Sequence, residues 1–119
     1  MTEGDSQDWE WPDSLDALVA ASQHHRLLFE NEEVRVLDTR IGPGETVPVH
    51  THRWPGVLYV FSSADFVRRD GDGNVLLDTR TAGVVLEPGT SLWTHPLPPH
   101  TLENVDDSEI RILAVEVKR

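Results

Sequence analysis

The chain has 119 residues, a length that fits one domain with a modest hydrophobic core. It contains no cysteine, which excludes disulfides and thiolate chemistry, and its formal net charge at pH 7 is -11. That charge disfavours binding to nucleic acid or to anionic membrane surfaces, because their phosphates would be repelled. We find no signal-peptide pattern and no apolar stretch long enough to span a bilayer, and we expect a cytoplasmic protein.

An acidic and polar tail is predicted over residues 1–12. It includes Trp9 and Trp11, just before a proline. Two interpretations stay open. The segment is either a disordered tail, or a strap that docks on a surface, because exposed tryptophans are unusual on soluble proteins and a purely solvating tail needs none.

A short helix is predicted over residues 13–23, where apolar side chains recur at helical spacing behind a capping residue. His24 and His25 follow its end. We interpret them as imidazoles favoured by the helix dipole rather than as a second metal site, because no third ligand is visible nearby in the sequence. Tail and helix together make a segment, residues 1–25, that precedes the main domain.

Residues 26–119 show short strands separated by turns. Ten segments have alternating or continuous apolar patterns: 27–30, 33–41, 45–51, 57–61, 65–69, 75–79, 84–86, 91–94, 101–105 and 109–117. The run Asp70–Asn74, with two glycines, is a strong hairpin turn signal. Many short strands at intervals of about ten residues indicate an all-β sandwich or barrel.

Two histidines, His50 and His52, stand one residue apart in a segment rich in valine and threonine. Alternate residues of a strand project to the same face, so both imidazoles should point the same way. They could hold one divalent metal if a third ligand arrived from elsewhere, and His100 is the candidate. The alternative is a pocket of hydrogen-bonded core histidines without metal. The residues leave the metal open among Fe, Zn, Ni and Mn.

The spacing around these histidines resembles the two motifs of small single-domain cupins. Six residues stand at places that the motifs specify: Gly44, His50, His52, Gly89, His100 and Asn104. The resemblance covers residues 26–119 and implies a double-stranded β-helix, the cupin jelly-roll barrel. It also implies a homodimer, for which residues 27–30 and the tryptophan segment are the candidate contacts.

One cupin ligand is missing from the pattern. The glutamate of the first motif falls at Gly56 or Val57, so the usual set of three histidines and one glutamate is reduced to three histidines. His95 stands where the second motif has proline and is a candidate extra ligand. A metal without a carboxylate ligand would keep its full charge and should favour an anionic chelating molecule.

Several neighbours of the motifs are candidate pocket residues: Trp54, Trp93, Leu102 and Asn104. Trp93 could orient a ligand through its polar ring atom, and Asn104 either braces the pocket or fixes a turn. Tyr59 and His95 are the candidate proton-transfer residues. Three arginines flank the hairpin and are interpreted as solvent-facing: Arg68, Arg69 and Arg80.

In ligand set, the protein is similar to the three-histidine iron dioxygenases, which include the cysteine dioxygenase and acetylacetone dioxygenase families. This implies dioxygenase-type chemistry on a small chelating, anionic molecule. Two alternatives stay open: a redox-neutral metal-dependent lyase or isomerase, and a small-ligand-binding module without turnover. The expected partners are a small-molecule ligand and a second copy of the chain, with no nucleic acid and no membrane.

Overall fold

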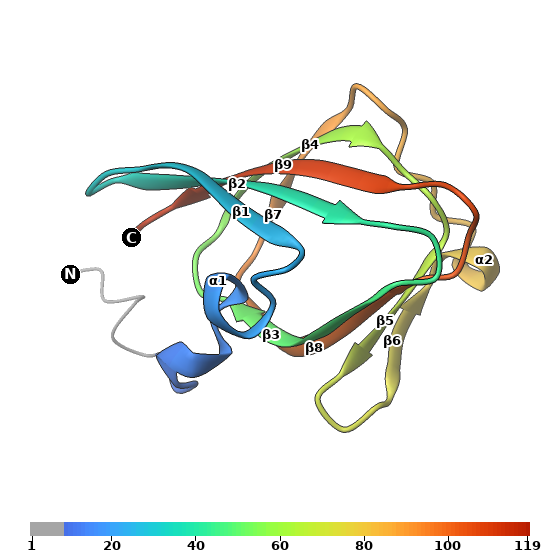
Figure 1. Cartoon of the computed structure of the whole chain (residues 1–119), viewed down its shortest axis with the longest axis horizontal. Coiled ribbons are helices and arrows are strands. Elements are labelled where there is room, and N and C mark those ends of the chain that lie inside the picture. The colour runs from blue at the N-terminus through green and yellow to red at the C-terminus, as the bar shows by residue number, and fades with distance from the viewer. Residues whose placement is uncertain (1–8) are drawn as a thin grey trace.

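Two antiparallel sheets face each other in the computed structural model, which describes residues 9–119 (Figure 1). The five-stranded sheet has the order β1 (His25–Glu30), β2 (Val34–Ile41), β9 (Ile110–Val117), β4 (Gly56–Ser62) and β7 (Ser91–Thr94). The four-stranded sheet has the order β3 (Thr46–His52), β8 (Leu97–Asn104), β5 (Phe66–Asp70) and β6 (Val75–Asp78). Strands far apart in the sequence therefore pair, as β2 and β9 do. The prediction of an all-β barrel is confirmed.

The strands carry the residues that favour extended backbone. β2 and β9 are rich in valine and isoleucine, and they pair without a bulge from Val34 opposite Val117 to Ile41 opposite Ile110. The predicted hairpin joins β5 to β6. Its turn is fixed by the Asp70 carboxylate, which accepts hydrogen bonds from the backbone N–H of Asp72 and Asn74. The predicted strand over residues 84–86 is not formed, and that segment is irregular.

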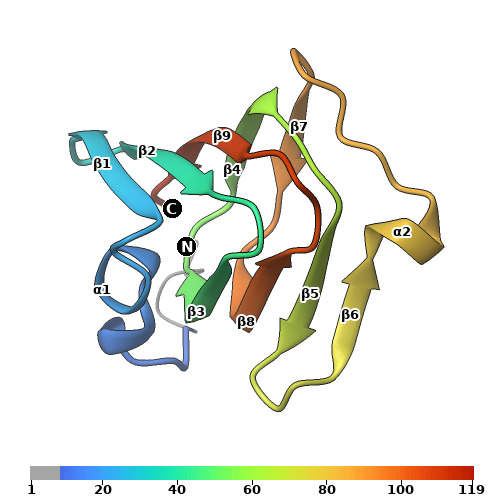
Figure 2. The same cartoon turned by 45° about the vertical axis from the view of Figure 1, so that its right-hand side comes forward.

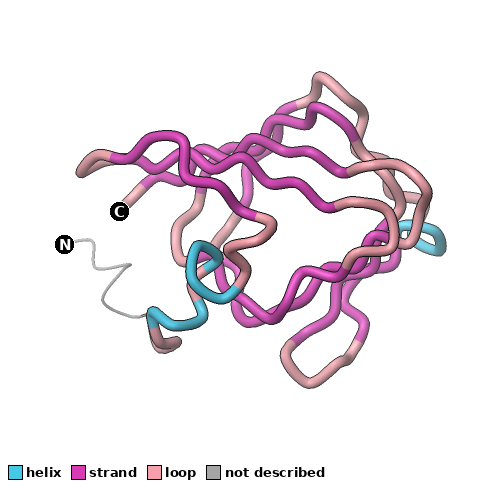
Figure 3. Tube along the Cα trace, viewed as in Figure 1, coloured by secondary structure: helices cyan, strands magenta, loops and turns pink. Residues whose placement is uncertain are grey.

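The helices are short, as the colouring of Figure 3 shows. A 3-10 turn, η2 (Asp13–Leu15), is followed by α1 (Ala17–Ala20), and α2 (Thr79–Ala82) follows β6. The predicted helix over residues 13–23 is thus broken, because Asp16 has extended backbone angles and caps α1 through the Leu18 N–H. Within residues 9–119, no helix has the length and apolar character that crossing a membrane requires.

The N-terminal segment lies where the two sheets approach each other. β1 and β3 are edge strands of the two sheets, and α1 contacts both (Figures 1 and 2). A parallel bridge between Asp16 and Thr51 fixes this junction, and the buried Ala17 and Ala21 face the barrel. In the tail, Trp9 and Trp11 pack edge to face with ring centroids 4.8 Å apart, whereas the predictions for residues 1–8 lie outside the described residues.

A hydrophobic core fills one part of the space between the sheets. Its buried members come from both sheets and from the N-terminal segment: Ala21, Ile41, Val47, Phe66 and Ile110. Four of these side chains also line a cavity of about 320 Å³ between the sheets. The apolar faces of the strands therefore build both the core and the walls of an internal chamber.

Candidate metal centre

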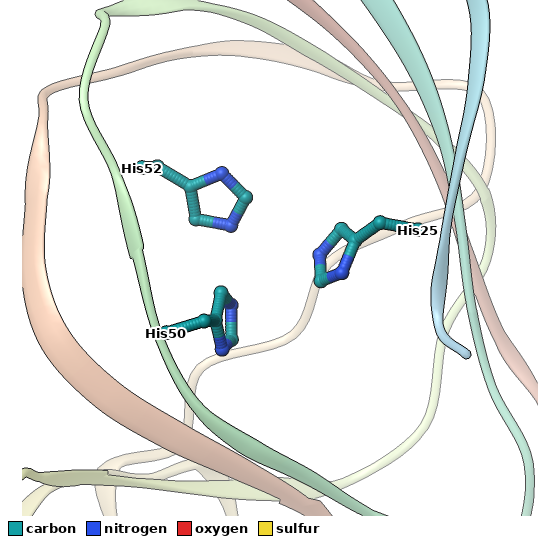
Figure 4. A group of neighbouring side chains, drawn as sticks. All are labelled: His25, His50 and His52. Atoms are coloured by element: carbon teal, nitrogen blue, oxygen red, sulfur yellow. The ribbon is translucent and has the colours of Figure 1, made fainter. Parts of the chain in front are cut away.

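Three histidines converge inside the barrel, and Figure 4 shows their rings pointing toward one another. His50 and His52 project together from β3, which confirms the prediction from their spacing. The third member is His25, the first residue of β1. One ring nitrogen from each lies within 4.8 Å of those of the other two, a separation that a single metal ion could bridge.

His25 is the ligand candidate that the sequence interpretation missed. We placed it at the end of a helix, but α1 ends at Ala20 and a turn then carries the chain into β1. His25 is only 5% exposed. It meets the two β3 histidines because the segment before it joins the edges of the two sheets. No local pattern indicates that contact, since β1 and β3 do not pair with each other.

His100 lies beside this group rather than within it. It stands on β8 directly opposite His50, with ring centroids 4.3 Å apart, and its ring centroid is 5.8 Å from that of His52. The structure thus brings the three predicted histidines to one place and adds His25. Four imidazoles line the same end of the cavity.

All four histidines are held in the same tautomer. Each Nδ1 lies within hydrogen-bond distance of an oxygen that can only accept: Ala21 O at 3.0 Å from His25, Pro48 O at 2.8 Å from His50, a Glu116 carboxylate oxygen at 2.9 Å from His52 and Pro98 O at 2.7 Å from His100. Each Nδ1 must therefore carry the proton and donate it. The Nε2 atoms are left with free lone pairs, which is the form of imidazole that binds a metal.

The electrostatic surroundings keep three of the rings neutral, those of His25, His50 and His100. Burial, followed by the neighbouring His52, lowers the pKa of His25 and His50 to about 3. Burial likewise lowers the pKa of His100 to about 4. Metal ions compete with protons for the Nε2 lone pair, so histidines that stay neutral at pH 7 are ready to bind.

A buried carboxylate supports the cluster without belonging to it. Glu116 of β9 accepts the His52 Nδ1–H with one oxygen and the Nε–H of Arg35 with the other. Burial alone would raise its pKa, but these two partners keep the pKa of Glu116 below its ordinary value. Arg35 also donates to both carboxylate oxygens of Asp16, at 2.8 and 3.1 Å. Hydrogen bonds between side chains therefore connect Asp16 in the N-terminal segment, through Arg35 and Glu116, to His52.

Gly56, one of the two positions where the motif resemblance places a glutamate, has no room for a side chain. This residue lies opposite Glu116 in the β4–β9 pair, and a Cβ added to it would stand 2.1 Å from the carbonyl oxygen of Val115. No side chain fits there without moving β9.

Two predicted proton-transfer residues do not reach the site. Tyr59 alternates with the buried Val60 on β4, is 38% exposed and packs against Phe61. His95 is exposed in the loop between β7 and β8. Neither is among the residues that line the cavity beside the histidines.

Two of the four predicted pocket residues line the cavity, and two do not. Trp54 and Leu102 line the cavity. Trp93 does not, because it is 45% exposed and lies under the Arg119 guanidinium. Asn104 is fully buried but fixes a turn, donating to the carbonyls of Ile41 and Ser108 at 3.0 and 2.8 Å. Of the two roles that the sequence left open for Asn104, the structure shows the one in a turn.

Arg68 lines the cavity, whereas the sequence predicted that it faces solvent. Arg69 pairs with Glu103 and Arg80 pairs with Asp78 on partly exposed surfaces, in keeping with the prediction for them. Arg68, however, is half-buried and lines the cavity. The interior therefore contains a cation that the sequence interpretation had placed in solvent.

The fold is that of the cupin double-stranded β-helix. A cupin domain from Bordetella pertussis Tohama I superposes with a TM-score of 0.64 at 22% identity, covering 80% of this chain and 92% of that one. An RmlC-like cupin from Methanocaldococcus jannaschii has a TM-score of 0.55 at 13% identity, covering 78% and 77%. The polyketide cyclase RemF from Streptomyces resistomycificus has a TM-score of 0.51 at 19% identity, covering 78% and 63%. No protein-family model and no curated protein matches the sequence.

Proposed function

We propose that the protein binds one divalent transition metal through His25, His50 and His52 and acts on a small organic anion. The observation that carries this proposal is the shared tautomer, because every Nδ1 is fixed as a donor and every Nε2 is left free. A cluster of core histidines needs no such uniformity. Neutral imidazoles suit Fe, Zn and Ni, whereas Mn more often takes oxygen ligands.

The ligand set leaves room for a substrate. Three protein ligands on one metal are typical of catalytic sites, in which water or substrate takes the remaining positions. The carboxylate that contacts the cluster, Glu116, is committed to His52 and Arg35. The imidazoles bring no negative charge, so an anionic chelating molecule would be favoured at the open positions.

The cavity sets the character of that molecule. Apart from the histidine end, most of its wall is aliphatic or aromatic, with Trp54 and Phe66 among the lining side chains. A volume of about 320 Å³ suits a small molecule. We therefore propose an organic anion with an apolar body, which these walls would hold away from water.

The finer proposal is dioxygenase-type chemistry. With Tyr59 and His95 outside, the ionisable side chains lining the cavity, among residues 9–119, are the four histidines, Glu116 and Arg68. Glu116 and Arg68 are engaged or permanently charged, so a lyase or isomerase that relies on protein proton transfer would have to use the free Nε2 of His100. When bound, a redox-active metal such as iron supplies the electrons and open positions that activation of O₂ requires. The protein residues would then orient the substrate and exclude water.

Metal analysis of the purified protein tests the site. We expect about one metal ion per chain in the wild type and a sharp loss in His50→Ala and His52→Ala. His95→Ala is the matched control, because its imidazole is exposed and outside the cavity, and it should keep the metal. Unchanged occupancy in both cluster variants would contradict the site.

Oxygen consumption tests the chemistry separately. The iron-loaded protein should consume O₂ with a β-diketonate or an α-hydroxy acid, and the zinc-loaded protein should not. A protein that binds metal but turns these anions over without consuming O₂ would be a redox-neutral enzyme. A protein that purifies without metal and takes none up would be a ligand-binding module.

A further inference from the structure

The Arg68 guanidinium lies in the wall of the cavity, and no counter-ion faces it among residues 9–119. Its Nε is buried and has no hydrogen-bond partner, and within the described chain no carboxylate pairs with it. The centroid of the Phe66 ring lies 5.9 Å from the guanidinium carbon. Burial lowers the pKa of Arg68, but arginine stays protonated in proteins, so the charge is retained.

Three other arginines of the barrel form ion pairs with carboxylates. Arg35 pairs with Glu116 and Asp16, Arg69 pairs with Glu103, and Arg111 pairs with Asp38. A charge removed from water without a partner destabilises a fold. An arginine that faces an apolar chamber unpaired therefore points to a ligand that brings the negative charge.

The sheet register places this cation next to the histidines. Arg68 of β5 stands opposite Leu102 of β8, and His100 lies two residues away on the same face of β8. Arg68 and His100 are thus diagonal neighbours, whose Cα atoms are about 7–8 Å apart in such a pair. His50 in turn stands opposite His100. One small molecule could therefore contact both Arg68 and the histidine cluster.

We infer that Arg68 is the anion-binding residue of the cavity and selects apolar carboxylates. Its planar guanidinium would donate paired hydrogen bonds to the carboxylate, which is the geometry that arginine matches best. The apolar body would fill the chamber, and a hydroxyl or keto oxygen beside the carboxylate would reach the metal. Only that last contact rests on the proposed function, because Arg68 and the chamber exist without a metal.

The test compares a charged probe with its neutral analogue. Mandelate has a carboxylate, an adjacent hydroxyl and an apolar ring, and mandelamide has a neutral amide of similar shape in place of the carboxylate. Calorimetric titration of the full-length protein, metal-free and zinc-loaded, should show mandelate bound more tightly than mandelamide. Arg68→Met and Arg68→Gln should lower mandelate affinity by about 10- to 100-fold and leave mandelamide unchanged. Arg68→Lys should restore part of the loss.

Arg69→Met is the matched control, because it removes the same charge from the same strand while its guanidinium faces Glu103. It should change mandelate affinity less than twofold. Equal losses in the Arg68 and Arg69 variants, or no binding of mandelate to either form of the wild type, would overturn the inference. A protein that takes up no zinc but loses mandelate selectivity only in the Arg68 variants would refute the metal site and support Arg68.

A second readout does not depend on any probe. Removing an unpaired, half-buried charge should stabilise the ligand-free fold, so the melting temperature of Arg68→Met should exceed that of the wild type. Arg69→Met should show no such gain, because it leaves Glu103 without its partner. A fall in melting temperature for Arg68→Met would mean that Arg68 serves the fold and would overturn a ligand-binding role.

Discussion

At the scale of single residues, Glu116 fixes how His52 presents its Nε2 atom. Glu116→Gln keeps the shape but removes the charge that faces both His52 and Arg35. We expect zinc affinity to fall by about 10- to 100-fold, because partners of metal-binding histidines have effects of that size. Competition with a chromophoric chelator measures this affinity. Glu103→Gln, on β8 and paired with Arg69, is the control, and equal affinities for the two variants would contradict the role of Glu116.

Gly56 is a second residue whose identity follows from close contact. The 2.1 Å approach of an added Cβ to the Val115 carbonyl predicts that Gly56→Ala destabilises the protein by about 1–3 kcal/mol, measured by urea unfolding. In Gly71→Ala the new methyl would meet only Pro99, at 3.5 Å, and should be tolerated. Equal stability of the two variants would refute the steric account. The same contact implies that Gly56→Glu disrupts β9 instead of restoring a ligand.

These residues show what the sequence could and could not predict. The period of two along β3 was sufficient to place His50 and His52 on one face. The same alternation from Phe66 could have placed Arg68 inside, but its position beside a hairpin favoured a solvent-facing interpretation. The sequence could not predict that His25 joins the cluster, because its contact with β3 depends on how two edge strands meet. Gly56 was interpreted as the position of a missing metal ligand. The sequence does not show that β9 comes too close to this position for any side chain.

At the scale of elements, the N-terminal segment is joined to the barrel by Asp16. Its carboxylate caps α1 through the Leu18 N–H and accepts two hydrogen bonds from Arg35, whose side chain is buried. We expect Asp16→Ala to lower the free energy of unfolding by about 2–4 kcal/mol, because it removes a cap and unpairs a buried cation. Chemical denaturation measures this loss.

Asp13→Ala is the control for that change. The Asp13 side chain is almost fully exposed, and its nearest cation is the Arg53 guanidinium at 3.8 Å. The stability of this variant should stay within about 0.5 kcal/mol of the wild type. If the Asp16 variant proved as stable as the Asp13 variant, the polar chain from Asp16 through Arg35 to Glu116 would not hold the segment in place.

At the scale of the whole molecule, the buried histidines make the metal-free protein sensitive to acid. Their folded-state pKa values, about 3 for His25 and His50 and about 4 for His100, lie below the 6.5 of an unperturbed histidine. As pH falls below that value, the unfolded chain takes up protons that the folded chain refuses, so stability is lost.

We expect the melting temperature of the metal-free protein to fall between about pH 7 and about pH 5, a window above the ordinary titration of carboxylates. Removing one buried imidazole, as in His50→Asn, should flatten this dependence, whereas the exposed His95→Gln should not. A melting temperature that stays constant across the window would contradict neutral, buried histidines.

Assembly is the remaining prediction at this scale. β1 is an edge strand whose Leu28 and Phe29 side chains are 48% and 53% exposed, and unpaired edges invite association. We expect a homodimer that uses this edge, and the pair of changes Leu28→Lys and Phe29→Lys should dissociate it in sedimentation velocity. Val85→Lys, at an exposed position in the irregular segment, should not. A wild type that sediments as a monomer at micromolar concentration would count against the dimer.

The central claim is that the histidine cluster binds a metal through Nε2 atoms, and X-ray absorption at the metal edge tests it most directly. For the zinc-loaded protein we predict nitrogen or oxygen neighbours at about 2.0–2.1 Å with the outer-shell scattering of three or four imidazoles. That scattering should weaken by one imidazole in His25→Ala and stay unchanged in His95→Ala. A spectrum with one imidazole or none, or one that His25→Ala leaves unaltered, would contradict the account.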